Sequence, residues 1–311
     1  MTPKQTPGMN GAKLTKVQRA EQRQEKARIL REQEAKRRLR NRVLMIVACV
    51  VVLAVVVFAV VKIIAASNAA KNGDPGSYRA AAKPAVLANV GDDFGITVDT
   101  NGAAAARDSS LPQVDIYSNA TCPHCMQLES AVDPAVNKYM KAGTVQFTFY
   151  PLATDPVGCE PQSVWATTAD FYIATYAPEQ FAAFHEQVMN AKDGVYAQIP
   201  EKTQAGQTIK GYCKATDPVQ PRDLAEFAKR VGVPSDVVNS LPAAVTSAEW
   251  RKVAESATQA FLANEKVCLS DQCGTPTVTL NGRIVGSTEY GGNNSAAFEA
   301  WLEKVATGKV R

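Results

Sequence analysis

Two thiols lie two residues apart near the middle of the chain, in the motif Cys122-Pro123-His124-Cys125. A pair at this spacing can hold a metal ion, form a permanent cross-link, or cycle between a dithiol and a disulfide. The chain has 311 residues, and its one other histidine is His185. The compartment helps to decide among these roles, because disulfides persist mainly outside the cytosol.

The residues around this motif predict a strand followed directly by a helix. The segment Gln113–Ser118 alternates apolar side chains, Val114 and Ile116, with an opposite face, as a strand does. The next pattern predicts a helix from about Cys122 to Lys141. The two thiols are therefore expected at a strand-to-helix turn.

This position predicts an acidic first thiol. A cysteine at a helix start faces backbone N–H groups without a helical partner and the positive end of the helix dipole. Both favour a thiolate at Cys122, and Cys125 lies one turn later, within bridging distance. A protonated His124 would add positive charge, and Pro123 fixes the turn. A lowered pKa makes Cys122 the sulfur that is attacked, and stabilising the reduced state makes the disulfide oxidising.

A second motif follows about 150 residues later. Thr275-Pro276 begins a predicted hairpin, Pro276–Gly286, that turns at Asn281-Gly282. A threonine-proline step entering a strand suits a cis peptide bond, which is essentially a proline feature.

The remaining patterns predict an α/β domain with a small mixed sheet between helices. A strand over Phe94–Gly102 precedes the first motif, and another follows its helix at Thr144–Leu152. A helical insertion, about residues 157–266, separates this βαβ unit from the terminal hairpin. Within the insertion, helices are predicted at 163–177, 178–191, 221–233 and 247–267, and the last helix of the chain is predicted at 295–308.

Together these features resemble the thioredoxin-like superfamily, and within it the DsbA-like branch with a helical insertion. The resemblance covers about Phe94 to Val305 and rests on VDIYSNATCPHC and GTPTVTLNG, with weaker support from FAAFHEQVMNA and DLAEFAKRVGV. It implies that Cys122 is the exposed nucleophile and Cys125 the buried resolving thiol. It also implies that Pro276 is cis and packs against the pair, while the Thr275 backbone pairs with an extended substrate peptide.

One position departs from this family pattern. Many relatives carry a buried acidic residue six positions before the first cysteine, where it accepts a proton. This chain has Ile116 there, and the neighbouring Asp115 belongs to the other strand face. Proton handling is therefore expected to rely on water or another group, and Asp115 is assigned no role.

Four further cysteines, Cys159, Cys213, Cys268 and Cys273, are candidates for structural disulfides. Four cysteines allow three pairings. If Cys268 and Cys273 close a small loop before the Thr-Pro motif, Cys159 and Cys213 would staple the helical insertion. A second hypothesis has Cys273 relay or regulate exchange at the active pair.

The sequence predicts no metal site, no cofactor and no nucleic-acid partner. His185 lies in an apolar helical stripe beside Phe181, Phe184 and Val188, so it is interpreted as a packed core histidine. The basic N-terminal segment lacks the interleaved aromatic residues that nucleic-acid binding favours.

The N-terminal segments predict the compartment. Residues 1–42 carry 13 Lys and Arg against 4 Asp and Glu and predict a basic cytoplasmic tail. Residues 43–65 begin with 19 uninterrupted apolar residues and predict a transmembrane helix, which needs about 20. A cleaved signal peptide has a shorter basic start and a shorter apolar stretch. The positive-inside rule then places a linker at 66–90 and the DsbA-like thioredoxin domain at 91–311 outside the cytoplasm.

These features predict a single-pass membrane protein whose extracytoplasmic domain oxidises thiols of unfolded or reduced exported proteins. The lipid bilayer would hold residues 43–65, and a quinone-linked membrane oxidase is the expected reoxidising partner. Two alternatives stay open on the sequence alone. The same fold can act as a reductase or isomerase, or the domain can be a non-catalytic adaptor or metal-carrying module.

Overall fold

The computed structural model describes residues 87–310, apart from 155–156, 205–206, 212, 215–216, 218 and 269–272. No helix in this described part is long and apolar enough to cross a bilayer. The tail and membrane span predicted at 1–42 and 43–65 lie outside it, as does the linker up to residue 86.

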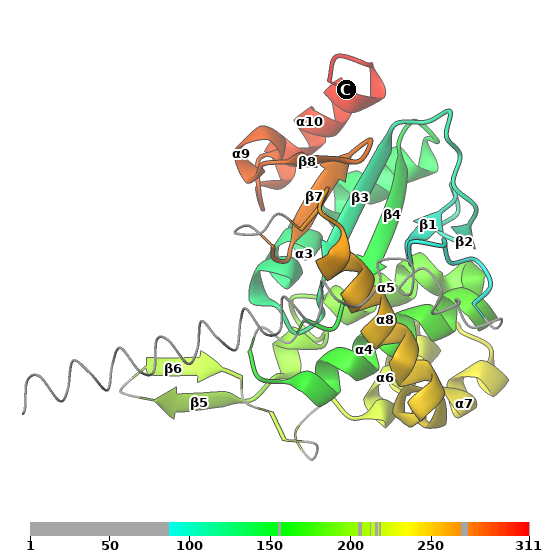
Figure 1. Cartoon of the computed structure of the whole chain (residues 1–311), viewed down its shortest axis with the longest axis vertical. Helices are drawn as coiled ribbons and strands as arrows, with labels where there is room; N and C mark the ends of the chain where they lie inside the picture. Colours follow the sequence, from blue (N-terminus) through cyan, green and yellow to red (C-terminus); the bar gives the residue numbers. More distant parts are fainter. Residues whose placement is uncertain are drawn as a thin grey trace, which may run out of the picture. The chain divides into compact units, whose positions relative to one another are not determined.

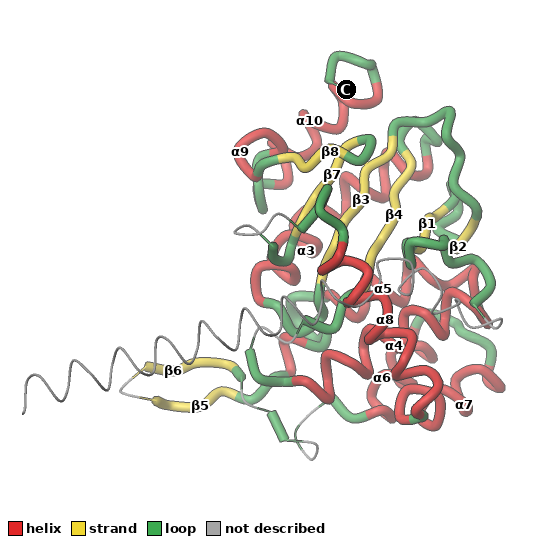
Figure 2. Tube along the Cα trace, viewed as in Figure 1, coloured by secondary structure: helices red, strands yellow, loops and turns green. Residues whose placement is uncertain are grey.

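A six-stranded mixed sheet in the order β2-β1-β4-β3-β7-β8 forms the centre of the fold (Figures 1 and 2). Strands β3 and β4 are parallel, as a βαβ crossover requires, and the other neighbours are antiparallel. The strands are β1 (Ile96–Val98), β2 (Ala104–Ala105), β3 (Gln113–Ser118), β4 (Gln146–Pro151), β7 (Thr277–Leu280) and β8 (Arg283–Val285).

Strand β3 is the central strand that leads directly to the first motif. It lies between β4 and β7, and all six of its residues are buried, because helices cover both faces of the sheet. The predicted bounds of β3 are confirmed. The predicted turn of the terminal hairpin is confirmed as well: Asn281 and Gly282 both have positive φ, 51° and 78°, as a two-residue hairpin loop of type I′ needs.

Helix α3 (Pro123–Lys141) follows β3 and runs through Pro134 without interruption. It ends before Gly143, whose φ of 62° is the left-handed conformation common after a helix. Its neighbours are α5 (Phe181–Met189) and α10 (Ser295–Ala306).

The segment between β4 and β7 contains more elements than the helical insertion that the sequence predicts. Its helices include α4 (Glu160–Tyr176), α5, α6 (Pro221–Arg230), α7 (Ser235–Thr246) and α8 (Ala248–Ala263), with 3-10 turns η1 (Pro178–Gln180) and η2 (Tyr196–Gln198). It also contains a separate hairpin of β5 (Glu201–Gln204) and β6 (Gln207–Lys210), drawn in Figure 1 at the lower left. The last short helix, α9 (Ser287–Tyr290), precedes α10.

Candidate active site

The first thiol lies at the junction between β3 and α3. Cys122 is the N-cap residue of α3, and Pro123 is the first helical residue, where its missing N–H costs nothing. The Cys122 N–H donates to the Asn119 carbonyl at 3.0 Å. Cys122 and Cys125 are both free thiols, and both are buried.

The surroundings of Cys122 favour its thiolate. A hydrogen bond from the Cys125 thiol is the largest cause that lowers the pKa of Cys122 to about 6, against an ordinary value of 9.0. Burial opposes this, while the backbone N–H groups of Cys125 and His124 and a hydrogen bond from Thr275 reinforce it. These amides belong to the first turn of α3, where N–H groups have no helical acceptor.

The second thiol is held protonated. Burial is the largest cause that raises the pKa of Cys125 well above its ordinary value, followed by the hydrogen bond it donates to Cys122 and the negative charge of that sulfur. Cys125 is completely buried, and its Sγ accepts a hydrogen bond from the Asn119 N–H at 3.5 Å. The pair therefore has one acidic and one weakly acidic sulfur.

The Thr-Pro motif lies directly against the first thiol. The Thr275–Pro276 peptide bond is cis, and the Cys122 Sγ is 3.5 Å from the Thr275 carbonyl oxygen. The two motifs meet because β7 pairs antiparallel with β3, with Thr277 opposite Tyr117. The structure also corrects one expectation: Cys122 is not exposed but only 3% accessible.

The other residues near the pair have different places. The His124 side chain is exposed, and its backbone amide stabilises the Cys122 thiolate. Ile116 is buried in β3. Asp115 is buried as well, but it bonds Arg107 Nη2 at 3.0 Å and Thr279 Oγ1 at 2.8 Å and joins a polar network within the sheet.

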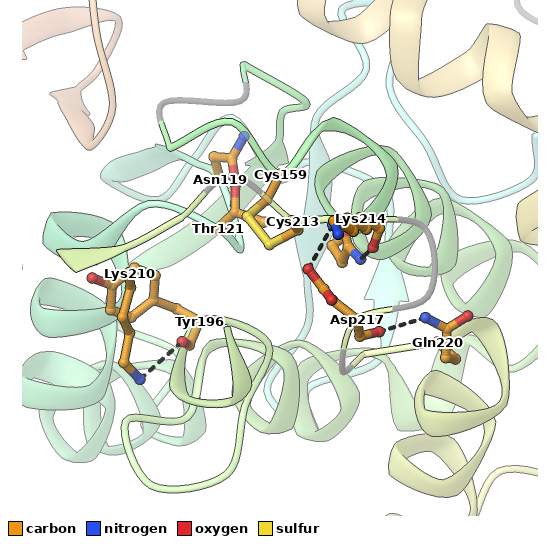
Figure 3. Close-up of a disulfide and its surroundings, with 10 residues drawn as sticks. Asn119, Thr121, Cys159, Tyr196, Lys210, Cys213, Lys214, Asp217 and Gln220 are labelled. Atoms are coloured by element: carbon orange, nitrogen blue, oxygen red, sulfur yellow. Dashed lines mark hydrogen bonds between the residues drawn. A yellow bond between two sulfur atoms is a disulfide. The ribbon is translucent and has the colours of Figure 1, made fainter. Parts of the chain in front are cut away.

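The four further cysteines form two disulfides. Cys159 pairs with Cys213 (Figure 3), and Cys268 pairs with Cys273. Cys159 is fully buried, whereas Cys273 is exposed. Within the described residues, no group of three or more His, Cys, Asp or Glu side chains could hold a metal ion.

His185 is packed in the core, as the sequence predicts, but its environment is ionic. Its Nε2 is 2.9 Å from Glu129 Oε2 and its Nδ1 is 3.1 Å from Asp170 Oδ2. All three side chains are buried. Sequence spacing gave no sign of this triad, because its members come from α3, α4 and α5.

Alkylation of Cys122 in the reduced protein is expected to follow a titration with its midpoint at about pH 6. The thiolate is the reactive form, so the rate should fall as the pH drops below that midpoint. Iodoacetamide labelling across a pH series, read by mass spectrometry of the peptide, measures this. Cys125→Ala should raise the midpoint, because it removes the largest stabilising contact. A wild-type midpoint near 9 would contradict the site described here.

The same titration affects stability. The folded-state pKa of Cys122 is depressed, so the thiolate contributes its full stabilisation above the unfolded value of 9.0, and the contribution is lost as the pH falls through about 6. At pH 7 it amounts to about 1.4 kcal/mol of extra stability for the reduced fold.

Residues 102–304 match the model of a protein family described as Thioredoxin, and this range contains both motifs. The chain is similar in structure to MdbA, a thiol-disulfide oxidoreductase from Actinomyces oris, at 23% identity and a TM-score of 0.52, over 72% of this chain and 92% of that one. It is also similar to the reduced disulfide bond oxidoreductase DsbG from Mycobacterium tuberculosis, at 20% identity and a TM-score of 0.49, over 70% and 89%. No curated relative matches by sequence.

Proposed function

Because the chain belongs to the thioredoxin family, whose model matches residues 102–304, we propose that it is a thiol–disulfide oxidoreductase that acts through Cys122 and Cys125. The observation that carries this proposal is the pairing of an acidic thiol with a buried, weakly acidic one beside Thr275-Pro276. The structural similarity to MdbA supports the assignment of the fold that positions the two cysteines.

The reaction begins with the Cys122–Cys125 disulfide. A client thiolate attacks Cys122 Sγ, the client–Cys122 bond forms, and the bond to Cys125 breaks. Cys125 leaves as a thiolate and takes up a proton, which its raised pKa favours. A second client thiolate then attacks the client sulfur and releases Cys122 as a thiolate. The client loses two electrons and gains a disulfide, and the protein becomes a dithiol.

The oxidising direction is favoured by the electrostatics of the reduced state. A leaving Cys122 with a pKa of about 6 is stable as an anion at neutral pH. Each contact that stabilises this thiolate stabilises the reduced protein and therefore makes its disulfide more oxidising. The reductase or isomerase alternative would need a less stabilised thiolate. The reduction potential separates the two: a value near −120 mV supports oxidation, and one near −270 mV supports reduction.

The proposed compartment is extracytoplasmic, and the proposed partners are exported proteins and a membrane oxidase. The apolar run at 43–65 and the basic segment 1–42 favour a single-pass membrane protein with a cytoplasmic N-terminus and an extracytoplasmic catalytic domain. Clients would be reduced, unfolded exported proteins, whose extended segments pair with the Thr275 backbone. A quinone-linked membrane oxidase would restore the disulfide.

A trapping experiment tests the proposal. In cells that express a Cys125→Ala variant, the Cys122 thiolate should attack a disulfide of an exported protein and release one client sulfur as a thiolate. No second thiol in the variant resolves this mixed disulfide, so covalent complexes with exported proteins should accumulate. The Cys122→Ala/Cys125→Ala double variant is the matched control and should trap nothing. Complexes with cytosolic proteins alone would contradict the location, and no complexes at all would contradict the activity.

A further inference from the structure

Asn119, the residue after β3, contacts the backbone N–H of Cys122 and the thiol of Cys125 through its own backbone. Its carbonyl accepts the Cys122 N–H at 3.0 Å, and its own N–H donates to Cys125 Sγ at 3.5 Å. Its side-chain oxygen accepts the Thr121 N–H at 2.6 Å and the Thr121 hydroxyl at 2.7 Å. Asn119 and Thr121 are both buried, so one residue determines the path of the loop that leads to Cys122.

The side-chain amide of Asn119 is held by residues from outside this loop. Its Nδ2 donates to Ser163 Oγ at 2.8 Å and to Thr154 Oγ1 at 3.2 Å. Ser163 is fully buried in the first turn of α4, and its N–H donates to the Cys159 carbonyl at 2.9 Å. A continuous chain of hydrogen bonds therefore joins the start of α4 to the thiol pair.

The Cys159–Cys213 disulfide fixes the start of α4. Cys159 is the N-cap residue of this helix, and the Cys213 N–H donates to the Gly158 carbonyl at 2.9 Å. Figure 3 shows the disulfide beside Asn119 and Thr121. Cys159 is fully buried and Cys213 is half-buried, so a thiol in solution can reach this bond only through the Cys213 sulfur.

We propose that Asn119 is a positioning residue for the Cys122 thiolate, and that the Cys159–Cys213 disulfide acts on this thiolate through Ser163 and Asn119. The amides of His124 and Cys125 stabilise the anion only while they point at its sulfur, because hydrogen bonds weaken steeply with poor alignment. Asn119 sets that alignment at the N-cap, and the disulfide keeps Ser163 in place to hold Asn119. The inference rests on the proposed function, since exchange is the reaction that the thiolate serves.

The experiment titrates Cys122 by thiolate ultraviolet absorbance in the full-length protein, with the Cys122–Cys125 pair reduced and the Cys159–Cys213 bond intact. Asn119→Ala and Ser163→Ala should each raise the midpoint, by about one pH unit for Asn119→Ala, which is about a tenfold loss in acid dissociation. Ser163→Thr keeps a hydroxyl at this position, so its titration midpoint should lie close to that of the wild type. Ser130→Ala is the matched control. It removes the hydrogen bond from the Ser130 hydroxyl, on α3, to the Met189 carbonyl at the end of α5, and it should leave the midpoint unchanged.

A double-variant cycle separates this coupling from a general loss of structure. If Asn119 and Ser163 act in one chain, Asn119→Ala/Ser163→Ala should shift the midpoint no further than Asn119→Ala alone. Cys159→Ala/Cys213→Ala should reproduce the Ser163→Ala shift. An unchanged midpoint in this variant would overturn the role of the disulfide. Where the double variant fails to fold, Cys213→Ala, which breaks the bond but keeps the buried Cys159 side chain, is titrated in its place. An unchanged midpoint in Ser163→Ala, or an equal shift in Ser130→Ala, would overturn the inference, whereas a wild-type midpoint near 9 would overturn the proposed function itself.

Discussion

A Cys122→Ser variant is expected to lose disulfide exchange activity by a factor of about 10³ or more. Serine is close in size, but its hydroxyl stays protonated in the same surroundings and cannot form the covalent intermediate with a client sulfur. The assay is the oxidation of a reduced dithiol peptide by stoichiometric oxidised protein, or insulin reduction for the reverse direction. Activity at the wild-type level in this variant would remove the enzymatic interpretation altogether.

The comparison with Cys125→Ser makes the expected result specific. That variant keeps Cys122 and removes the resolving thiol. Offered a peptide that contains a disulfide, its Cys122 thiolate should attack one peptide sulfur, release the other as a thiolate and stop at the mixed disulfide. Cys122→Ser should form none, because the sulfur it retains, at Cys125, has a pKa well above the ordinary value and stays a thiol at neutral pH. The two variants therefore differ in the covalent product as well as in rate.

The parts of the fold that could be predicted from sequence are those with a strong local pattern. The strand β3, the helix after it and the terminal hairpin each combine apolar periodicity with a clear turn or cap signal. The hairpin β5–β6 was missed because its residues, Glu201–Gln204 and Gln207–Lys210, are nearly all polar and show no alternation. Helix α7 was missed because it contains Pro242, which argues against a helix interior.

In the candidate site, too, only the residues that belong to a local motif could be predicted from the sequence. The cysteine pair and Thr275-Pro276 have recognisable local motifs, but Asn119 is held by Ser163, which lies 44 residues away in the chain. An asparagine between a strand and a helix is an ordinary turn residue in sequence. Its role depends on which helix the fold brings to its side chain, and no local pattern carries that information.

A His185→Leu variant is expected to destabilise the protein by about 3–5 kcal/mol, as the loss of one partner from a buried ionic group does. The flanking carboxylates raise the pKa of His185 well above its ordinary value, Asp170 more than Glu129, although burial alone would lower it. The second oxygens, Glu129 Oε1 and Asp170 Oδ1, have no hydrogen-bond partner among the described residues. Without the imidazolium, two carboxylates remain buried and uncompensated. Urea unfolding at neutral pH measures the difference.

Two further variants show whether charge or packing causes this loss. His124→Leu changes the chain's other histidine, which is exposed, and should alter stability by no more than about 0.5 kcal/mol. In the triple variant Glu129→Leu/His185→Leu/Asp170→Leu, no buried charge is left without a partner, and apolar replacement of a buried ionic triad is often neutral or stabilising. The triple variant should therefore recover much of the stability that His185→Leu loses. The triple variant could instead be less stable than His185→Leu, by as much as the Glu129 and Asp170 replacements would each cost as ordinary core substitutions. In that case His185 stabilises the core by its shape and not by compensating charge.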